Sequence, residues 1–209
     1  DGENKDMLMV ENLRAAMVRD TFILKGRQER ISPRFTFHGY RYLEITGMDK
    51  ALPLKDVRGK VLTSVPEDTA DYHTSNEDVN RLFQNIQWST RANFLAIPTD
   101  CPQRNERMGW AGDLNVFGNT AVYLANSDNF LRQHMLAMRD TQASDGRFTD
   151  TAPLGHGAGG FIWGSAGVQI PWQLYLQYGD TTVLVEHYDA MKAYVDYMLS
   201  CRQADGLYK

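Results

Sequence analysis

The sequence predicts a mixed fold, in which a short β segment is followed by an all-α region. From about Met17 to Val65 the apolar residues are patterned as in strands, whereas from Ser75 onward they recur at spacings of three and four. A helical unit also recurs about every 50 to 60 residues, as in arrays of helical hairpins. The expected divisions are a β segment at residues 1–65, a polar linker at 66–74 and a helical region at 75–209.

The β segment contains three candidate strands, Thr21–Leu24, Phe35–Ile45 and Lys60–Leu62, which glycines separate. Three or so strands are too few to close a sandwich around a buried core. We therefore expect this segment to complete a sheet whose other strands precede residue 1.

The helical region is expected to begin where Ser75 and Asp78 can form a capping box. This first helix runs to about Asn93, with an apolar face that includes Val79 and Leu82. Further helices are expected at about 114–124, 131–138, 164–178 and 184–198, and Pro171 should kink or start the third of these.

The helices repeat as a group. Leu124–Asp128 leads into a helix that ends at Gln142–Gly146, and Leu176–Asp180 leads into one that ends at Gln203–Gly206. Such units are typical of stacked or toroidal hairpin arrays. A toroid of six hairpins at this spacing needs roughly 300 residues or more, so we expect further hairpins beyond Lys209.

Composition excludes several classes of partner. The 209 residues carry a net charge of -4 and no concentration of Lys and Arg, which argues against binding to nucleic acid or an anionic membrane. No apolar stretch approaches the roughly 18 to 20 residues of a membrane span. An uncharged or weakly acidic polymer is the expected partner. The oligomeric state and the compartment, extracytoplasmic or cytoplasmic, stay open.

The most informative segment is the carboxylate loop, residues 98–113. It contains three carboxylates, two arginines and a tryptophan. Pro98, Pro102, Gly109 and Gly112 should keep it out of regular helix and strand, so that its side chains can converge. Convergent carboxylates are the basis of general acid and base catalysis.

Glu106 is the candidate general acid. The neighbouring Met108 and Trp110 would favour its neutral form, whereas Arg104 and Arg107 would favour the ionised form. The alternative is a salt-bridged surface glutamate. Arg104 could equally contact sugar hydroxyls or pair with a carboxylate inside the loop.

Asp100 and Asp113 flank Glu106 at six and seven residues, which favours a catalytic role for at least one of the three carboxylates. Turn or helix capping is the alternative for both aspartates. Trp110 and Trp163 are candidate platforms for the apolar face of a sugar, or ordinary core residues.

His156 could contact a ligand or simply be exposed. The carboxylate spacing matches no EF-hand loop and no histidine pair is near, so neither a metal nor a cofactor is expected.

The run Ile97–Asp113 strongly resembles the signature of the bacterial α-L-rhamnosidases of glycoside hydrolase family 78. Pro33–Tyr42 resembles the end of that family's β-sandwich domain, and Trp163-Gly164 together with Ile170–Trp172 resembles a later part of its barrel. The resemblance extends from about Ala16 to Tyr208.

Two positions depart from the family pattern. Asn105 and Ser165 stand where an aspartate is common, which bears on substrate fit rather than on reaction type.

The resemblance implies an inverting hydrolase on an (α/α)6 barrel, preceded by a β-sandwich, that releases terminal α-L-rhamnose from a glycoside or polysaccharide. It implies that Glu106 is the general acid and that the general base lies beyond Lys209, so that these 209 residues alone should be inactive. The residues that it implies contact the sugar are Asp100, Arg104, Trp110, Asp113 and Trp163.

Two alternatives stay open. One is another α/α-barrel glycosidase that acts on a different sugar, and the other is a noncatalytic carbohydrate-binding scaffold.

Overall fold

The structure is a computed structural model that describes residues 8–158 and 160–206. The chain forms two compact units. The first unit comprises Asp1–Val61 and Cys101–Arg107, and the second comprises Leu62–Asp100 and Met108–Lys209.

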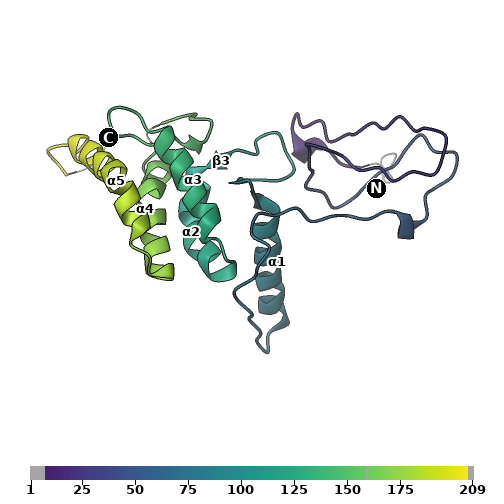
Figure 1. Cartoon of the computed structure of the whole chain (residues 1–209), viewed down its shortest axis with the longest axis horizontal. Helices are drawn as coiled ribbons and strands as arrows, with labels where there is room; N and C mark the ends of the chain where they lie inside the picture. The colour runs from purple at the N-terminus through teal and green to yellow at the C-terminus, as the bar shows by residue number, and fades with distance from the viewer. Residues whose placement is uncertain (1–7, 159, 207–209) are drawn as a thin grey trace. The chain divides into compact units, whose positions relative to one another are not determined.

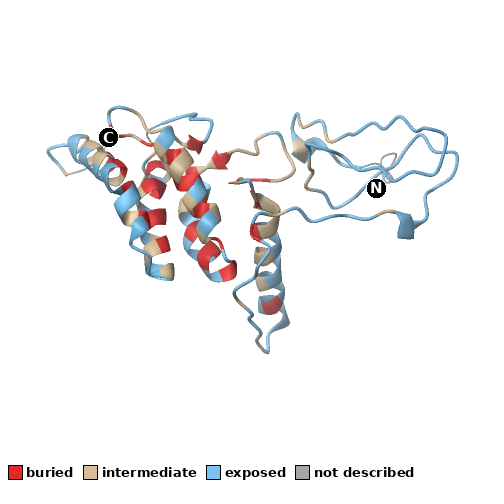
Figure 2. Ribbon diagram, in the orientation of Figure 1, coloured by how far each residue is buried: buried red, intermediate tan, exposed pale blue. Residues whose placement is uncertain are grey.

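Residues 8–61 of the first unit form no strand. Their regular structure consists of two short 3₁₀ helices, Glu11–Leu13 and Leu54–Asp56. The strands expected in this segment are thus not formed. The amide and carbonyl groups of a strand need an adjacent strand to bond, and these residues do not pair in that way. Large apolar side chains such as Ile23 and Phe35 are exposed, and Figure 2 shows this segment almost entirely in the colour of exposed residues.

Within the first unit, residues 101–107 are held by the segment around Phe37. The Gly39 N–H donates to the Pro102 carbonyl at 3.1 Å, and the Arg107 guanidinium donates to the Phe37 carbonyl at 2.8 Å. The Arg107 guanidinium also lies over the Phe37 ring, 5.1 Å from its centroid. A side chain at Gly39 would lie 2.8 Å from Pro102, so this close approach requires glycine.

The second unit is mainly helical (Figure 1). Its helices are α1 (Glu77–Asn93), α2 (Ala111–Leu124), α3 (Asp128–Asp140), α4 (Phe161–Tyr178) and α5 (Thr182–Ser200). Four two-residue strands form two antiparallel pairs: β1 (Phe94–Leu95) with β2 (Ile97–Pro98), and β3 (Gly109–Trp110) with β4 (Thr151–Ala152).

Helix α1 has its N-cap one residue later than predicted. Asn76, not Ser75, is the N-cap, and its Oδ1 accepts from the N–H groups of Asp78 at 3.0 Å and Val79 at 3.3 Å. These are the N2 and N3 positions that an N-cap side chain normally satisfies. Val79 and Leu82, expected on the apolar face, are exposed.

Two helical hairpins, α2 with α3 and α4 with α5, enclose the core, as the repeat predicted. Helix α4 contacts α2, α3 and α5. Most of the largest fully buried side chains lie on these helices, and Figure 2 shows the buried residues of the second unit concentrated there. They include Leu131, Met135, Ile170, Leu174 and Val183.

Helix α4 contains glycines against which aromatic rings pack. Helix α4 begins at Phe161, three residues before its expected start, and continues through Pro171. A side chain at Gly164 would meet the Tyr194 ring at 2.6 Å, and one at Gly167 would meet the Phe148 ring at 2.3 Å. These glycines permit close packing of α4 against the two aromatic rings.

The expected linker is bonded to the second unit along its first half. The Thr69 N–H donates to the Leu124 carbonyl and the Asn126 N–H donates to the Glu67 carbonyl, both at 3.0 Å. Asp68 pairs with Arg91 of α1. These contacts fix residues 67–69 beside the C-terminal end of α2.

Over the described ranges, 8–158 and 160–206, we find no helix that combines the length and the hydrophobicity needed to cross a bilayer.

Candidate active site

Asp100 and Met108 close the carboxylate loop at its base. The Asp100 N–H donates to the Met108 carbonyl at 3.2 Å, and the Met108 N–H donates to Asp100 Oδ1 at 3.0 Å. The side chain of Asp100 thus replaces a backbone acceptor, as aspartates often do in turns. One of the two carboxylate oxygens of Asp100 therefore closes the loop on Met108.

Glu106 lies in the first unit and accepts from two arginines. Its Oε2 is 2.7 Å from Nη2 of Arg104 and 3.0 Å from Nη1 of Arg14. The Glu106 side chain is 24% exposed, whereas that of Arg14 is 59% exposed. The pairing of Arg104 inside the loop, one of its two predicted alternatives, is therefore present.

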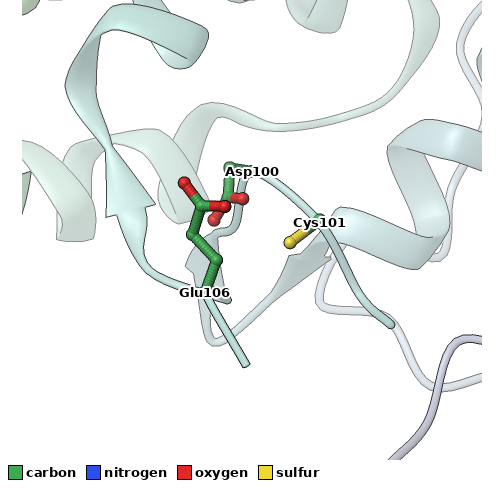
Figure 3. Close-up of side chains that lie close together, drawn as sticks. All are labelled: Asp100, Cys101 and Glu106. Atoms are coloured by element: carbon green, nitrogen blue, oxygen red, sulfur yellow. The ribbon is translucent and has the colours of Figure 1, made fainter. Parts of the chain in front are cut away.

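Arg14 is a partner of Glu106 that the sequence analysis did not identify. It is 92 residues from Glu106 and lies in no recognisable motif, so only the tertiary structure reveals the contact. Figure 3 shows the Glu106 side chain together with those of Asp100 and Cys101. Within the first unit, the Cys101 sulfur and a Glu106 carboxylate oxygen lie within 4.8 Å of each other.

A cavity of about 540 Å³ in the second unit brings three predicted site residues together: Asp100, Asp113 and Trp163. Asp113 lies in the first turn of α2 and Trp163 in the first turn of α4. Both residues were expected in loops, but each lies in a helix, close to its N-terminal end. The remaining residues that line the cavity are Ser89, Thr90, Asn93, Phe94, Pro98, Thr99, Gly112, Leu114, Val116, Phe117 and Ile162.

Asn93 is a cavity residue that the sequence did not single out. Its carbonyl accepts from the Thr99 N–H and from the Thr99 hydroxyl, both at 3.0 Å. These bonds fix the tight β1–β2 turn that leads into the carboxylate loop. The only sequence signal at Asn93 was that the helical period ends there.

Trp110 is the N-cap residue of α2 and pairs with Thr151 through β3 and β4. Its indole nitrogen is buried and makes no hydrogen bond to the part of the chain that the structure describes. Trp110 is not among the residues that line the cavity. His156, in the loop after β4, is exposed, which was the alternative to a ligand contact.

Ser165 connects the two helices that carry Asp113 and Trp163. Asn115 Nδ2 donates to the Ile162 carbonyl at 3.0 Å and contacts Ser165 Oγ at 3.4 Å. Ser165, one of the two positions where the resemblance led us to expect an aspartate, therefore bonds to α2 from within α4.

Two buried titratable side chains contact the backbone near the starts of α2 and α4. Burial lowers the pKa of His134 to about 4, and this imidazole packs beneath Gly109, where an added side chain would lie 2.9 Å from its Cε1. Burial raises the pKa of Tyr194 to about 12, so its hydroxyl stays protonated and donates to the Phe161 carbonyl at 3.2 Å. Both groups are neutral at neutral pH, as expected for buried side chains.

The six predicted residues divide between the two units. Glu106 and Arg104 belong to the first unit, and Asp100, Trp110, Asp113 and Trp163 belong to the second. The second unit supplies a cavity with two carboxylates and an indole ring, a mixture suited to the hydroxyl groups and the apolar face of a sugar.

Comparison with family models gives two matches that together cover almost the whole chain. Residues 67–208 match the bacterial alpha-L-rhamnosidase 6 hairpin glycosidase domain. Residues 3–63 match the bacterial alpha-L-rhamnosidase concanavalin-like domain. The mixed fold class predicted from the sequence agrees with both.

Curated relatives of this chain are named alpha-L-rhamnosidase. The chain is 45% identical over 201 residues to an alpha-L-rhamnosidase of Streptomyces avermitilis, covering 94% of this chain and 19% of that protein. It is 40% identical over 191 residues to an alpha-L-rhamnosidase of Formosa agariphila, covering 88% of this chain and 20% of that protein. The chain thus spans about a fifth of the length of these relatives.

Solved structures agree. The structure is similar to that of the Streptomyces avermitilis alpha-L-rhamnosidase complexed with L-rhamnose, with a TM-score of 0.89 and 44% identity over 94% of this chain and 19% of that one. It is also similar to an alpha-L-rhamnosidase from Dictyoglumus thermophilum, with a TM-score of 0.81 and 38% identity over 86% of this chain and 21% of that one. The hairpins, the carboxylate loop and these similarities have one explanation: the chain belongs to the bacterial α-L-rhamnosidase family.

Proposed function

We propose that this chain is part of an α-L-rhamnosidase that hydrolyses terminal α-L-rhamnosides with inversion of the anomeric carbon. The observation that carries the proposal is the cavity that Asp100, Asp113 and Trp163 line, within a segment similar to an α-L-rhamnosidase solved with L-rhamnose. Rhamnose is a 6-deoxy sugar, so carboxylates suit its hydroxyl groups and an indole ring suits its apolar face.

Glu106 acts as the general acid and protonates the leaving glycosidic oxygen. Its Oε2 now accepts from Arg14 and Arg104, and Arg14 is the more exposed of the two donors. Substrate therefore displaces Arg14 rather than Arg104, which frees Glu106 to hold a proton beside the leaving group. Arg104 keeps the carboxylate oriented.

An inverting glycosidase needs a second carboxylate, roughly 6.5 to 9.5 Å from the acid, that activates water on the opposite face of the sugar. We assign Asp100 and Asp113 to sugar binding, and Arg104, Trp110 and Trp163 to further sugar contacts. The general base is then supplied from outside these 209 residues, in keeping with relatives that are about five times as long.

The test is a chimera in which this chain replaces the matching 201-residue segment of the Streptomyces avermitilis relative. The chimera is expected to hydrolyse an aryl α-L-rhamnoside, and proton NMR of the first product should show the inverted anomer. The 209-residue chain alone is expected to release no phenol from this substrate.

Each other outcome identifies an alternative. A folded chimera that prefers an aryl glycoside with a polar C6 group over the rhamnoside would indicate another α/α-barrel glycosidase. A chimera that binds L-rhamnose but hydrolyses nothing would indicate a noncatalytic scaffold. Brisk hydrolysis by the 209 residues alone would show that the general base is among them.

A further inference from the structure

The indole ring of Trp163 packs closely against two glycines that come from different parts of the second unit. Gly112 lies in the first turn of α2, and Gly160 is the residue before α4. A Cβ on Gly112 would lie 2.7 Å from Cε2 and 2.8 Å from Nε1 of Trp163. A Cβ on Gly160 would lie 2.6 Å from Cε3. Real Cβ atoms essentially never approach another atom this closely, so any side chain at either position would displace the indole ring.

Backbone conformation does not explain either glycine. Gly160 has a φ of -71° and a ψ of 116°, which any residue adopts, and Gly112 is helical without a positive φ. Glycine inside a helix costs roughly 0.5 to 1 kcal/mol relative to alanine. Contact with the indole ring is therefore the physical reason for glycine at both positions.

The ring held in this way borders the cavity that Asp100 and Asp113 also line. Its Nε1 is buried, yet it has no hydrogen-bond partner among residues 8–158 and 160–206. Buried indole N–H groups usually find a partner, because an unsatisfied buried donor is costly. A donor of this kind, on the wall of a mainly apolar cavity that two carboxylates also line, is suited to a hydroxyl group of a ligand.

We propose that Gly112 and Gly160 are positioning residues that fix the indole ring of Trp163, so that its Nε1–H donates a hydrogen bond to a hydroxyl of the sugar in the cavity. The identity of the ligand rests on the proposed function, whereas the fixing of the ring does not. Gly112 and Gly160 then act only through Trp163.

The first test examines the ring without a ligand. In the 209-residue chain labelled with ¹⁵N-tryptophan, the indole N–H signal of Trp163 is assigned by its loss in Trp163→Phe. Gly112→Ala and Gly160→Ala are expected to shift or broaden this signal. Gly118→Ala is the matched control, because Gly118 also lies in α2 but an added Cβ there would lie 2.3 Å from Cδ1 of Ile170 in α4 instead of meeting Trp163. An unchanged Trp163 signal in both glycine variants would overturn the proposal.

The second test measures what the ring does, in the chimera with the Streptomyces avermitilis relative. Loss of one neutral hydrogen bond weakens binding by about 2- to 12-fold, so Gly112→Ala is expected to raise KM by that factor with little change in kcat. In a Trp163→Phe background the same substitution should change KM by less than about 2-fold, because phenylalanine lacks the indole atoms that the added methyl group would meet.

The two proposals fail in different ways. If the unsubstituted chimera folds but neither binds nor hydrolyses rhamnosides, the proposed function is wrong, and the indole spectra still decide whether the glycines fix the ring. If the chimera is active and Gly112→Ala raises KM equally with and without Trp163, the glycine does not act through the indole and the positioning role is refuted.

Discussion

Nη2 of Arg104 lies 2.7 Å from Oε2 of Glu106, two residues further along the carboxylate loop. Arg14 contacts the same oxygen at 3.0 Å, from the segment that matches the concanavalin-like domain. The proposed acid is therefore oriented by one guanidinium of its own loop and by another from a distant part of the sequence. This arrangement makes the role of Glu106 testable by conservative substitution.

Glu106→Gln is expected to lower kcat of the chimera by about 10² to 10⁴, because the amide keeps the shape of the side chain but cannot donate the catalytic proton. An aryl leaving group that needs no protonation should recover part of the loss. Glu186→Gln is the matched control, since Glu186 also pairs with an arginine, Arg139 at 3.8 Å, outside the site. Equal losses for Glu106→Gln with good and poor leaving groups would argue against the acid role.

Two substitutions at Asp100 distinguish the effect of its charge on substrate binding from the effect of its acceptor oxygen on closure of the carboxylate loop. Asp100→Ala removes the acceptor of the Met108 N–H and is expected to cost about 1 to 3 kcal/mol of unfolding free energy, measured by chemical denaturation. Asp100→Asn keeps an acceptor oxygen, so stability should change little, while loss of the charged acceptor should raise KM for a rhamnoside about 10-fold or more. Similar stability losses in the two variants would show that the carboxylate charge, not the acceptor, closes the loop.

His134 should make the second unit less stable as the pH falls. Burial lowers its pKa from 6.5 to about 4, so between these values the unfolded chain binds a proton that the folded chain does not. Unfolding free energy should therefore fall as the pH is lowered from about 6.5 to 4 and level off below that, a loss on the order of 3 kcal/mol.

The His134→Leu variant should lack most of this dependence, as measured by urea denaturation at pH 7 and pH 4.5. The exposed His156→Leu serves as the control and should keep it. An unchanged pH dependence in His134→Leu would assign the effect to other groups, such as His187, whose pKa burial also lowers.

The cap of α1 gives a test of local structure. Asn76→Ala is expected to lower the unfolding free energy by about 1 kcal/mol, because the N–H groups of Asp78 and Val79 lose their acceptor. Ser75→Ala should change it by less than about 0.5 kcal/mol, since surface substitutions away from such contacts have small effects. A larger loss for Ser75→Ala than for Asn76→Ala would favour the capping box that the sequence suggested.

Short-range patterns predicted much of the second unit. Spacings of three and four located helices α1, α2, α3 and α5, because the periodicity of an amphipathic helix is set by residues a few positions apart. Helix starts were less well predicted: Gly112, Asp113 and Trp163 belong to helices, since a glycine that admits a neighbouring ring resembles one that makes a turn. The domain boundaries at residues 65 and 74 and the roles of the six site residues stay predictions.

The sequence by itself determined the helical hairpins, the carboxylate loop and the family, because each depends on residues close together in the chain. Only the tertiary structure decided that Arg14 contacts Glu106, that Asp100, Asp113 and Trp163 share a cavity, and that Gly112 and Gly160 flank one indole ring. It also decided that residues 8–61 form no strand, since a strand needs a neighbour to bond. These contacts join residues far apart in sequence, and side-chain packing, not local propensity, determines which of them meet.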